Sequence, residues 1–492
     1  MAFRILLLTL IYVSSATALK ASQACASDGK GKSASLARGV ALFEEKRYPQ
    51  ARQEFLEATR RDPGSAEAFF YLGMAEAHLS NAPAAERCLR HALELNPKSV
   101  NTLYNLGVLL LDQKKPRQAI PYLEKASQAG PPSPELSVNL IGAYLDSENK
   151  DRALEVARSA ARKFEGQPAF DLALGKCYLA HNLLAEARAS LEEANRLAPL
   201  QPGVVIPLAD ACLRQKDVAA ARKALEGIRT RAQDLAEYHY LLGQSYFLSG
   251  ETQGALGEIR LAAKLDPQNP AYLLTLGRYE QKYGDQQSAI NALEKAGRLA
   301  PDLAEIPYSM AVGYFIADDF AQASKFVERA LELDPNFDRA LFLLGIVRFA
   351  QGQSSEAERL LGRTRALKPG NPFYQCFYGM ALLSENRMAE ALAPLRKAIA
   401  LEPSYALAHY QLGRLWTRNG RYSEASAELE KAIALQPDLS EAYYQIGQAY
   451  RRLGEKEKAD RALELFRKYH AAEYSERQEV LKEMQDVVRG QP

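Results

Sequence analysis

Residues 236–269 read AEYHYLLGQSYFLSGETQGALGEIRLAAKLDPQN, and the pattern of this stretch recurs along the chain every 34 residues. One position of the repeat never varies, because alanine stands there in all thirteen copies. These alanines are Ala51, Ala85, Ala119, Ala153, Ala187, Ala221, Ala255, Ala289, Ala323, Ala357, Ala391, Ala425 and Ala459. A fixed period between about 20 and 50 residues indicates one small structural element stacked in tandem. The sequence therefore predicts thirteen copies of one element with no insertion between them.

Other positions follow the same period when the alanine is numbered 20. The repeats then start at residues 32, 66, 100, 134, 168, 202, 236, 270, 304, 338, 372, 406 and 440. Position 8 is glycine in ten repeats, and a glycine inside a helix costs about 1 kcal/mol relative to alanine. This glycine indicates that a second helix approaches closely, with the alanine at position 20 and a large apolar residue at position 24. Proline at position 32 ends the second helix, because it has no backbone N–H to donate.

This pattern resembles the tetratricopeptide repeat family. The seventh repeat carries the family motif as Leu242, Gly243, Tyr246, Ala255, Ile259, Ala262 and Pro267. The twelfth repeat carries it as His409, Leu412, Gly413, Trp416, Ala425, Leu429, Ala432 and Pro437. The resemblance implies an all-α fold, an α-solenoid of about thirteen helix-turn-helix repeats in a right-handed superhelix. It also implies that the first helix of each repeat lines an inner groove. The fourth and sixth repeats depart from the motif, with Ile141 and Ala209 at position 8, and we expect a local change near residues 134–235.

The start of the chain has the pattern of a secretory signal peptide. A positively charged Arg4 precedes an apolar run over residues 5–13, and Ala16-Thr17-Ala18 fits a cleavage site. We predict a signal peptide at residues 1–18, with cleavage as late as residue 24 as the alternative, and a flexible lead-in at 19–31. Later cleavage would make Cys25 the first residue, as in a lipid-anchored protein. Ser22 argues against a lipid anchor at Cys25, because such proteins prefer an aliphatic residue at that place.

The apolar run is too short for an integral membrane span, which needs about 20 apolar residues. The sequence therefore predicts an exported protein that is periplasmic or secreted. The tandem array is predicted at residues 32–473 and a capping helix at 474–492. In that last segment Ser475 and Gln478 form a capping-box pattern, followed by an apolar stripe. The stripe consists of Val480, Leu481, Met484 and Val487.

Composition and spacing give no sign of chemistry. A net charge of +2 argues against a nucleic-acid partner, which would require a basic stripe. The six histidines are spread over five different repeats, and neither they nor the five cysteines have metal-ligand spacing. No phosphate-binding loop or nucleophile elbow is present. We predict no catalytic residue, no metal and no cofactor, and hence no enzyme. Cys177 and Cys212, at similar positions of adjacent repeats, are either a disulfide or two small buried side chains.

The resemblance places repeat positions 2, 5, 6, 9, 12 and 13 in the inner groove. Aromatic side chains at position 5 are candidate anchors for an extended or helical peptide, although they could instead pack against neighbouring helices. These are Tyr240, Tyr308, Phe342, Tyr410 and Tyr444. Polar candidates at positions 6, 9 and 13 are Asn105, Asn139, Gln411, Arg414, Arg418, Gln445, Gln448 and Arg452. Amides suit a peptide backbone and arginines suit a carboxylate, whereas the alternative is an ordinary polar surface.

The sequence therefore favours a non-catalytic scaffold that binds another protein, or an extended peptide of one, in the groove of an envelope protein. One alternative is an assembly or export factor of an envelope polysaccharide or secretion machine. Another is an accessory subunit of an enzyme. The clamp by which some members of the family hold chaperone tails is not supported, because position 5 never holds lysine.

Overall fold

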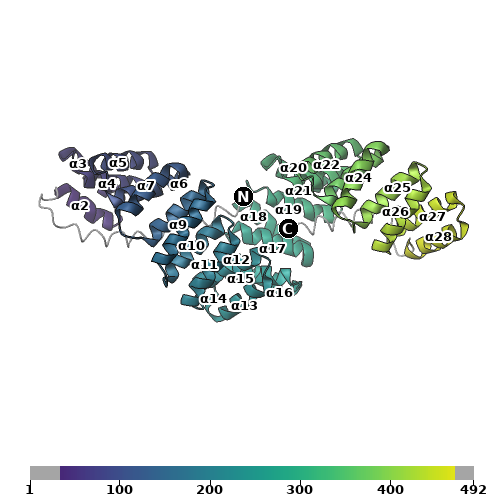
Figure 1. Cartoon of the computed structure of the whole chain (residues 1–492), viewed down its shortest axis with the longest axis horizontal. Coiled ribbons are helices and arrows are strands. Elements are labelled where there is room, and N and C mark those ends of the chain that lie inside the picture. Colours follow the sequence, from purple (N-terminus) through teal and green to yellow (C-terminus); the bar gives the residue numbers. More distant parts are fainter. Residues whose placement is uncertain (1–33, 471–492) are drawn as a thin grey trace. The chain divides into compact units, whose positions relative to one another are not determined.

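The structure is a computed structural model that describes residues 34–470, and this part of the chain consists of helices without any strand (Figure 1). The all-helical fold predicted from the repeat is confirmed. The signal peptide, the lead-in and the capping helix that the sequence predicts lie outside the described residues. The contacts divide the chain into an N-lobe, residues 1–249, and a C-lobe, residues 250–492.

Helices come in pairs, a first and a second helix for each repeat. The described N-lobe contains α2 (Ala34–Glu44), α3 (Tyr48–Arg61), α4 (Ala66–His78), α5 (Ala82–Leu95), α6 (Val100–Asp112), α7 (Pro116–Ala129), α8 (Pro134–Asp146), α9 (Lys150–Lys163), α10 (Pro168–Ala180), α11 (Leu184–Leu197), α12 (Pro202–Arg214), α13 (Val218–Gly227), α14 (Arg229–Ala232) and α15 (Ala236–Leu248). The described C-lobe contains α16 (Thr252–Leu265), α17 (Pro270–Tyr283), α18 (Gln286–Leu299), α19 (Glu305–Ile316), α20 (Phe320–Leu333), α21 (Asp338–Ala350), α22 (Ser354–Leu367), α23 (Pro372–Ser384), α24 (Met388–Leu401), α25 (Ala406–Arg418), α26 (Tyr422–Leu435), α27 (Ser440–Leu453) and α28 (Lys456–His470).

Helix pairs are closed by a left-handed residue at repeat position 15. Glycine supplies it at Gly250, Gly352, Gly420 and Gly454. Other residues supply it at Lys46, Ser80, Lys114, Glu148, Asn182, Lys216, Asp318 and Asn386. A left-handed residue after a helix turns the chain back while satisfying the last carbonyl groups. The eighth repeat differs, because α17 continues to Tyr283 and Gly284 has a φ of −120°.

The core of a repeat lies where position 8 of the first helix meets positions 20 and 24 of the second. The alanines at position 20 are buried in every repeat, with Ala289 at 0% exposure. A Cβ atom added to Gly277, at position 8, would lie 2.5 Å from Leu293 Cγ and 3.3 Å from the Ala289 carbonyl oxygen. Most glycines at position 8 are in the same situation, each against the side chain at position 24. The absence of a side chain at position 8 is therefore what lets the helices of a pair touch.

The fourth repeat reverses the sizes at this contact. Ile141 occupies position 8 and Ala157 occupies position 24, and both are buried, at 0% and 4% exposure. In the neighbouring third repeat the same two positions hold Gly107 and Leu123, the usual arrangement. One large and one small residue thus fill the same space in either order, as close packing of a core requires.

The second helix of the sixth repeat is interrupted at Ile228, between α13 and α14. Ile228 is fully buried and occupies repeat position 27, where ten other repeats have alanine. A β-branched side chain needs more room there than alanine does. The break lies within residues 134–235, the region where the sequence predicts a local change.

Polar contacts tie four of the described repeats to the one before. A side chain at position 11 of the first helix pairs with position 25 of the preceding second helix. The pairs are Tyr144 with Glu124, Glu280 with Arg260 (2.7 Å), Arg348 with Glu328 (2.5 Å) and Tyr450 with Glu430 (2.6 Å). The partners are 20 residues apart in each case, so the same two repeat positions form the contact each time.

Replacing Gly277 by alanine should destabilise the C-lobe by about 1–3 kcal/mol, because the new Cβ must displace Leu293. Gly257→Ala is the matched control, since an added Cβ there meets nothing within 4 Å and Gly257 is exposed within α16. The control should stabilise the lobe by up to about 1 kcal/mol. Urea-unfolding midpoints of the full-length variants measure both effects, and equal midpoints would contradict the close approach.

The reversed contact predicts strong coupling between Ile141→Gly and Ala157→Leu. The first change leaves a cavity and should cost about 4 kcal/mol, and the second should cost about 2 kcal/mol by overpacking. The double variant recreates the arrangement of the third repeat and should recover about 2–3 kcal/mol of the summed loss. Amide hydrogen exchange in α8 and α9 reads these energies locally, and additive effects would refute the compensation.

Candidate functional site

The first helix of each repeat has one side that its own pair does not use. At roughly 100° per residue, positions 2, 6, 9 and 13 lie about 100–160° around the helix from position 8. We call this side the A-face of each lobe. Position 5 lies only about 60° from position 8, so its side chain points between helices rather than away from them.

The A-face of the N-lobe carries an amide and phenol group on two neighbouring helices, α6 and α8. Asn139 donates from Nδ2 to the Tyr104 hydroxyl at 2.9 Å, and Asn105 donates from Nδ2 to the Asn101 carbonyl at 2.8 Å. All three side chains are partly exposed. Burial and the nearby Glu135 carboxylate raise the pKa of Tyr104 to about 12, and the bond from Asn139 partly opposes this. The phenol therefore stays a neutral hydrogen-bonding group at neutral pH.

Charged groups continue this face on the next helices, α10 and α12. Lys176 and Asp210 both occupy position 9 of adjacent repeats and are partly exposed. Arg214 pairs with Asp210 at 3.5 Å and donates to the Leu179 carbonyl at 3.1 Å. Burial raises the pKa of Asp210, and the Arg214 guanidinium limits that rise. The face thus offers both signs of charge beside neutral amides.

Four of the five predicted aromatic anchors are buried, which corrects their assignment as exposed anchors. Tyr240 and Tyr308 are 7% and 6% exposed, and Phe342 and Tyr410 are 1% exposed. The Phe342 ring packs against the Tyr374 ring at 4.8 Å, and Tyr308 packs in the same way against a neighbouring phenylalanine. The reason is the direction of position 5, toward the adjacent helices.

Tyr444, in the last repeat, is the exception. It is 43% exposed, and its ring lies 5.3 Å from the Phe466 ring of α28. It is the one predicted aromatic anchor that stays open to a ligand.

The polar candidates of the C-lobe divide into two groups. Gln411 is fully buried and accepts from Arg414 Nη1 at 3.1 Å, so its predicted role in an exposed amide ladder is corrected. Arg418 is exposed and donates to the Leu383 carbonyl at 2.9 Å, a contact with the preceding repeat. Gln445 is partly exposed, and Gln448 and Arg452 are exposed.

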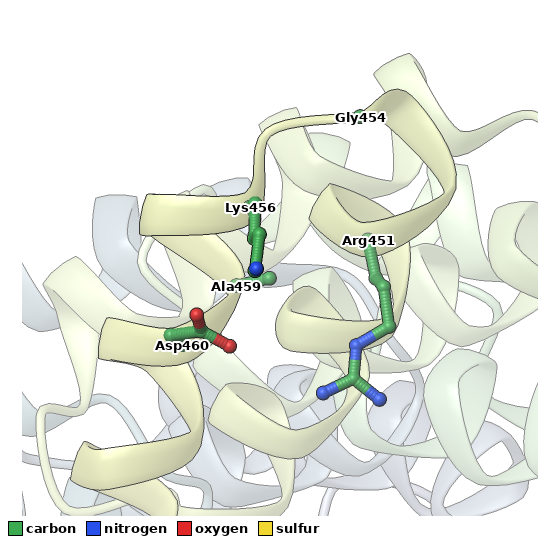
Figure 2. Close-up of a pocket in the computed structure, with 5 residues that line it drawn as sticks. All are labelled: Arg451, Gly454, Lys456, Ala459 and Asp460. Carbon is green, nitrogen blue, oxygen red and sulfur yellow. The ribbon is translucent and has the colours of Figure 1, made fainter.

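A shallow hollow lies at the turn between α27 and α28 (Figure 2). Arg451, Gly454, Lys456, Ala459 and Asp460 line it, and all of them except Ala459 are exposed. Such an open surface buries too little of a small molecule to be a ligand pocket. Within residues 34–470 no group of histidine, cysteine and acidic side chains is arranged to hold a metal ion.

The described residues also bear on the predictions about a disulfide and a membrane span. Cys177 and Cys212 are buried free thiols rather than a disulfide. No helix between residues 34 and 470 is long and apolar enough to cross a membrane.

Family models match the chain along most of its length. Models described as tetratricopeptide repeat match residues 17–66, 36–86, 88–120, 110–177, 178–245, 314–375, 346–406 and 441–471. A model described as TPR repeat matches residues 415–454. The chain is a tetratricopeptide repeat protein. The family predicted from the repeat motif is thereby confirmed.

One solved structure similar to this tetratricopeptide repeat protein is a chain of the crystal structure of the APC/C hetero-tetramer Cut9-Hcn1. It has 14% sequence identity and a TM-score of 0.47, with 91% of this chain and 95% of that chain covered. No curated protein matches the chain.

The sequence did not predict the shared role of one set of polar residues. Position 4 of a first helix contacts the carbonyl oxygen six residues earlier, at position 32 of the preceding repeat. The contacts are His239 to Gln233 (2.8 Å), Gln375 to Pro369 (3.0 Å), His409 to Pro403 (3.1 Å) and Tyr443 to Pro437 (3.0 Å). Histidine, glutamine and tyrosine have in common only a hydrogen-bond donor at a similar distance from the backbone. The sequence therefore shows no shared residue type at position 4. These residues hold the turn between repeats of the tetratricopeptide array.

His181 gives the N-lobe a pH-dependent contact with Asp146, a residue at position 13 of the A-face. Burial opposes its charge, but hydrogen bonds with Asp146, at 3.2 Å, and with the Cys177 carbonyl prevail and raise the pKa to about 10. A raised pKa in the folded state stabilises the fold below the unfolded value of 6.5. That contribution should be lost as pH rises from about 6.5 toward 10.

Asp146→Asn should therefore cost about 1 kcal/mol near pH 6 and almost nothing near pH 10, because Asp146 is half exposed. Thermal midpoints of wild type and variant at the two pH values test this. Asp151→Asn is the control, since Asp151 is exposed in the first turn of α9 and should show no such dependence. A pH-independent effect of Asp146→Asn would contradict the charged pair.

Proposed function

We propose that the protein is a non-catalytic scaffold that binds an extended segment of another protein on the A-face of the N-lobe. The observation that carries the proposal is the pair of partly exposed amides, Asn105 and Asn139, on the neighbouring helices α6 and α8. Each amide uses Nδ2 in a bond within the lobe, which fixes the side chain and leaves its oxygen as an acceptor. Two fixed acceptors suit the N–H groups of a peptide backbone, whatever its side chains.

The charged groups on α10 and α12 give this surface a means of selection. A segment that runs from the amides toward Lys176 and Asp210 meets one charge of each sign. Because the Arg214 side chain is already tied to Asp210 and to a backbone carbonyl, it is held in place before a ligand arrives. Groups that are ordered in advance lose less entropy on binding.

We propose further that the partner belongs to the cell envelope, because residues 1–18 have the pattern of a signal peptide. A polysaccharide ligand has less support. Stacking on sugar rings needs open aromatic faces, whereas Tyr240, Tyr308, Phe342 and Tyr410 are all buried. A secretion or export assembly is compatible with the proposal when one of its proteins is the bound partner.

Photocrosslinking tests the surface directly. A photoreactive residue at position 139 should capture a protein partner from envelope extracts. The double variant Asn105→Ala with Asn139→Ala should weaken that partner's binding about 10–30-fold. The expected loss follows from about 1 kcal/mol for each of two hydrogen bonds.

The matched control is Gln53→Ala with Gln118→Ala, which removes two exposed amides from the second helices α3 and α7. This double variant should bind the partner like wild type. Equal losses in both double variants, or capture of carbohydrate instead of protein at position 139, would refute the proposal.

A further inference from the structure

Both ring nitrogens of His409 face a hydrogen-bond acceptor. His409 occupies position 4 of α25 and is 4% exposed. Its Nδ1 lies 2.6 Å from Glu428 Oε2 in α26, and its Nε2 lies 3.1 Å from the Pro403 carbonyl oxygen in the turn before α25. A neutral imidazole has a hydrogen on only one nitrogen, whereas a backbone carbonyl and an ionised carboxylate can only accept. Both contacts are therefore hydrogen bonds only when the ring is doubly protonated and charged.

Glu428 is the ionised partner that such a ring needs. Its Oε1 accepts from Lys431 Nζ at 2.9 Å, so each carboxylate oxygen has its own donor. The hydrogen bond with His409 lowers the pKa of the Glu428 carboxyl, and the bond from Lys431 acts in the same direction against the opposite effect of burial. Within residues 34–470, Glu428 is the one charged side chain in a hydrogen bond or ion pair with the ring, and Lys431 is bound to the other oxygen of its carboxylate.

Histidine and glutamate occur together at these two repeat positions. Position 4 is histidine in two of the thirteen repeats, at His239 and His409. Both repeats have glutamate at position 23, as Glu258 and Glu428, whereas the other eleven repeats have one glutamate there, Glu54. A histidine that served only the turn would not need the glutamate, so the sequence favours a pair that acts together.

Other residues at position 4 hold the turn without a charge. Gln375 donates to the Pro369 carbonyl at 3.0 Å, and Tyr443 makes the equivalent bond at 3.0 Å. At position 23 their own repeats have Pro394 and Ala462, which offer no acceptor side chain. One bond from a neutral donor is thus enough to hold the turn, and the second bond of His409 gives this turn an additional property.

We propose that His409 is a pH-sensitive tie between the turn at Pro403 and helix α26. The doubly protonated ring joins the two, because one N–H donates to the carbonyl and the other donates to the Glu428 carboxylate. When the pH rises and the ring loses a proton to water, one nitrogen becomes an acceptor that faces another acceptor. The tie is therefore present at acid pH and is lost as the pH rises. Histidine suits this role because its charge ordinarily changes between about pH 5 and 8.

The effect of releasing the tie is confined to one junction of the array. Stability of a repeat array is nearly a sum over repeats and their interfaces. Loss of the bond at Pro403 should loosen the turn before α25 and the first turn of that helix, while the other repeats keep their contacts. The N-lobe amides Asn105 and Asn139 lie on other helices, so this inference does not depend on the binding function proposed above.

Nitrogen-15 NMR of the histidine side chains in the full-length protein tests the charged state directly. At pH 5.5 the His409 ring should show two protonated nitrogens, and its signals are assigned by their loss in His409→Gln. A ring with one protonated nitrogen at this pH would overturn the proposal.

Amide hydrogen exchange in the full-length protein tests the tie itself. Relative to the intrinsic exchange rate at each pH, protection in the first turn of α25 should fall about tenfold between pH 5.5 and pH 9, because a hydrogen bond of a charged group is lost. His409→Gln should remove this dependence and keep the protection, since glutamine can donate to the Pro403 carbonyl as Gln375 does to Pro369. The same pH dependence in wild type and variant, or constant protection in wild type, would refute the tie.

Gln375→His is the matched control for the role of the glutamate. It places an imidazole at position 4 of α23, in a repeat whose position 23 is Pro394. This ring should donate to the Pro369 carbonyl while neutral, so protection in α23 should not fall between the two pH values. A fall like that of α25 would show that any histidine at this position responds to pH, and the pairing with Glu428 would be wrong.

Discussion

The structure depends on the space shared by repeat positions 8 and 24. A first helix can touch its partner only if the two side chains together fill one fixed volume beside the alanine at position 20. Glycine with leucine meets this condition at Gly277 and Leu293, and isoleucine with alanine meets it at Ile141 and Ala157. The constraint acts on the pair rather than on either residue. This is why a motif that reads only position 8 treats the fourth repeat as a departure, although its core is packed.

From this contact the rest of the array follows by repetition. Each pair presents the same edges to the next, so polar contacts between repeats recur at constant separation. Tyr450 with Glu430 and Arg348 with Glu328 use different chemistry at the same two positions. Stability of such an array is nearly a sum over repeats and their interfaces. No residue far away in the sequence is needed to hold a given repeat.

The sequence predicted the fold well, because helix pairs are local and their signals recur thirteen times. Errors could average out over thirteen copies of Gly and Ala, whereas a site has only one copy of each residue. Phe342 and Tyr410 were proposed as anchors by residue type, yet position 5 directs both rings between helices. The left-handed turn residue at position 15 was also missed. Lysine at Lys46 and glutamate at Glu148 adopt that backbone without the glycine or asparagine that signals it.

Polar residues of the A-face show that residue type alone does not determine whether a side chain is used by the fold. Arg418 is a residue type that suits a carboxylate ligand, but one of its nitrogens donates to the Leu383 carbonyl. Asn139 has the same kind of side chain as many surface residues, but its bond to Tyr104 holds it in one orientation. In both cases the decisive partner lies 35 residues away, one repeat and one residue along the chain. A periodic fold thus converts a neighbour in space into a fixed offset in sequence. Searching that offset for donor and acceptor pairs would identify the side chains whose orientation the fold fixes.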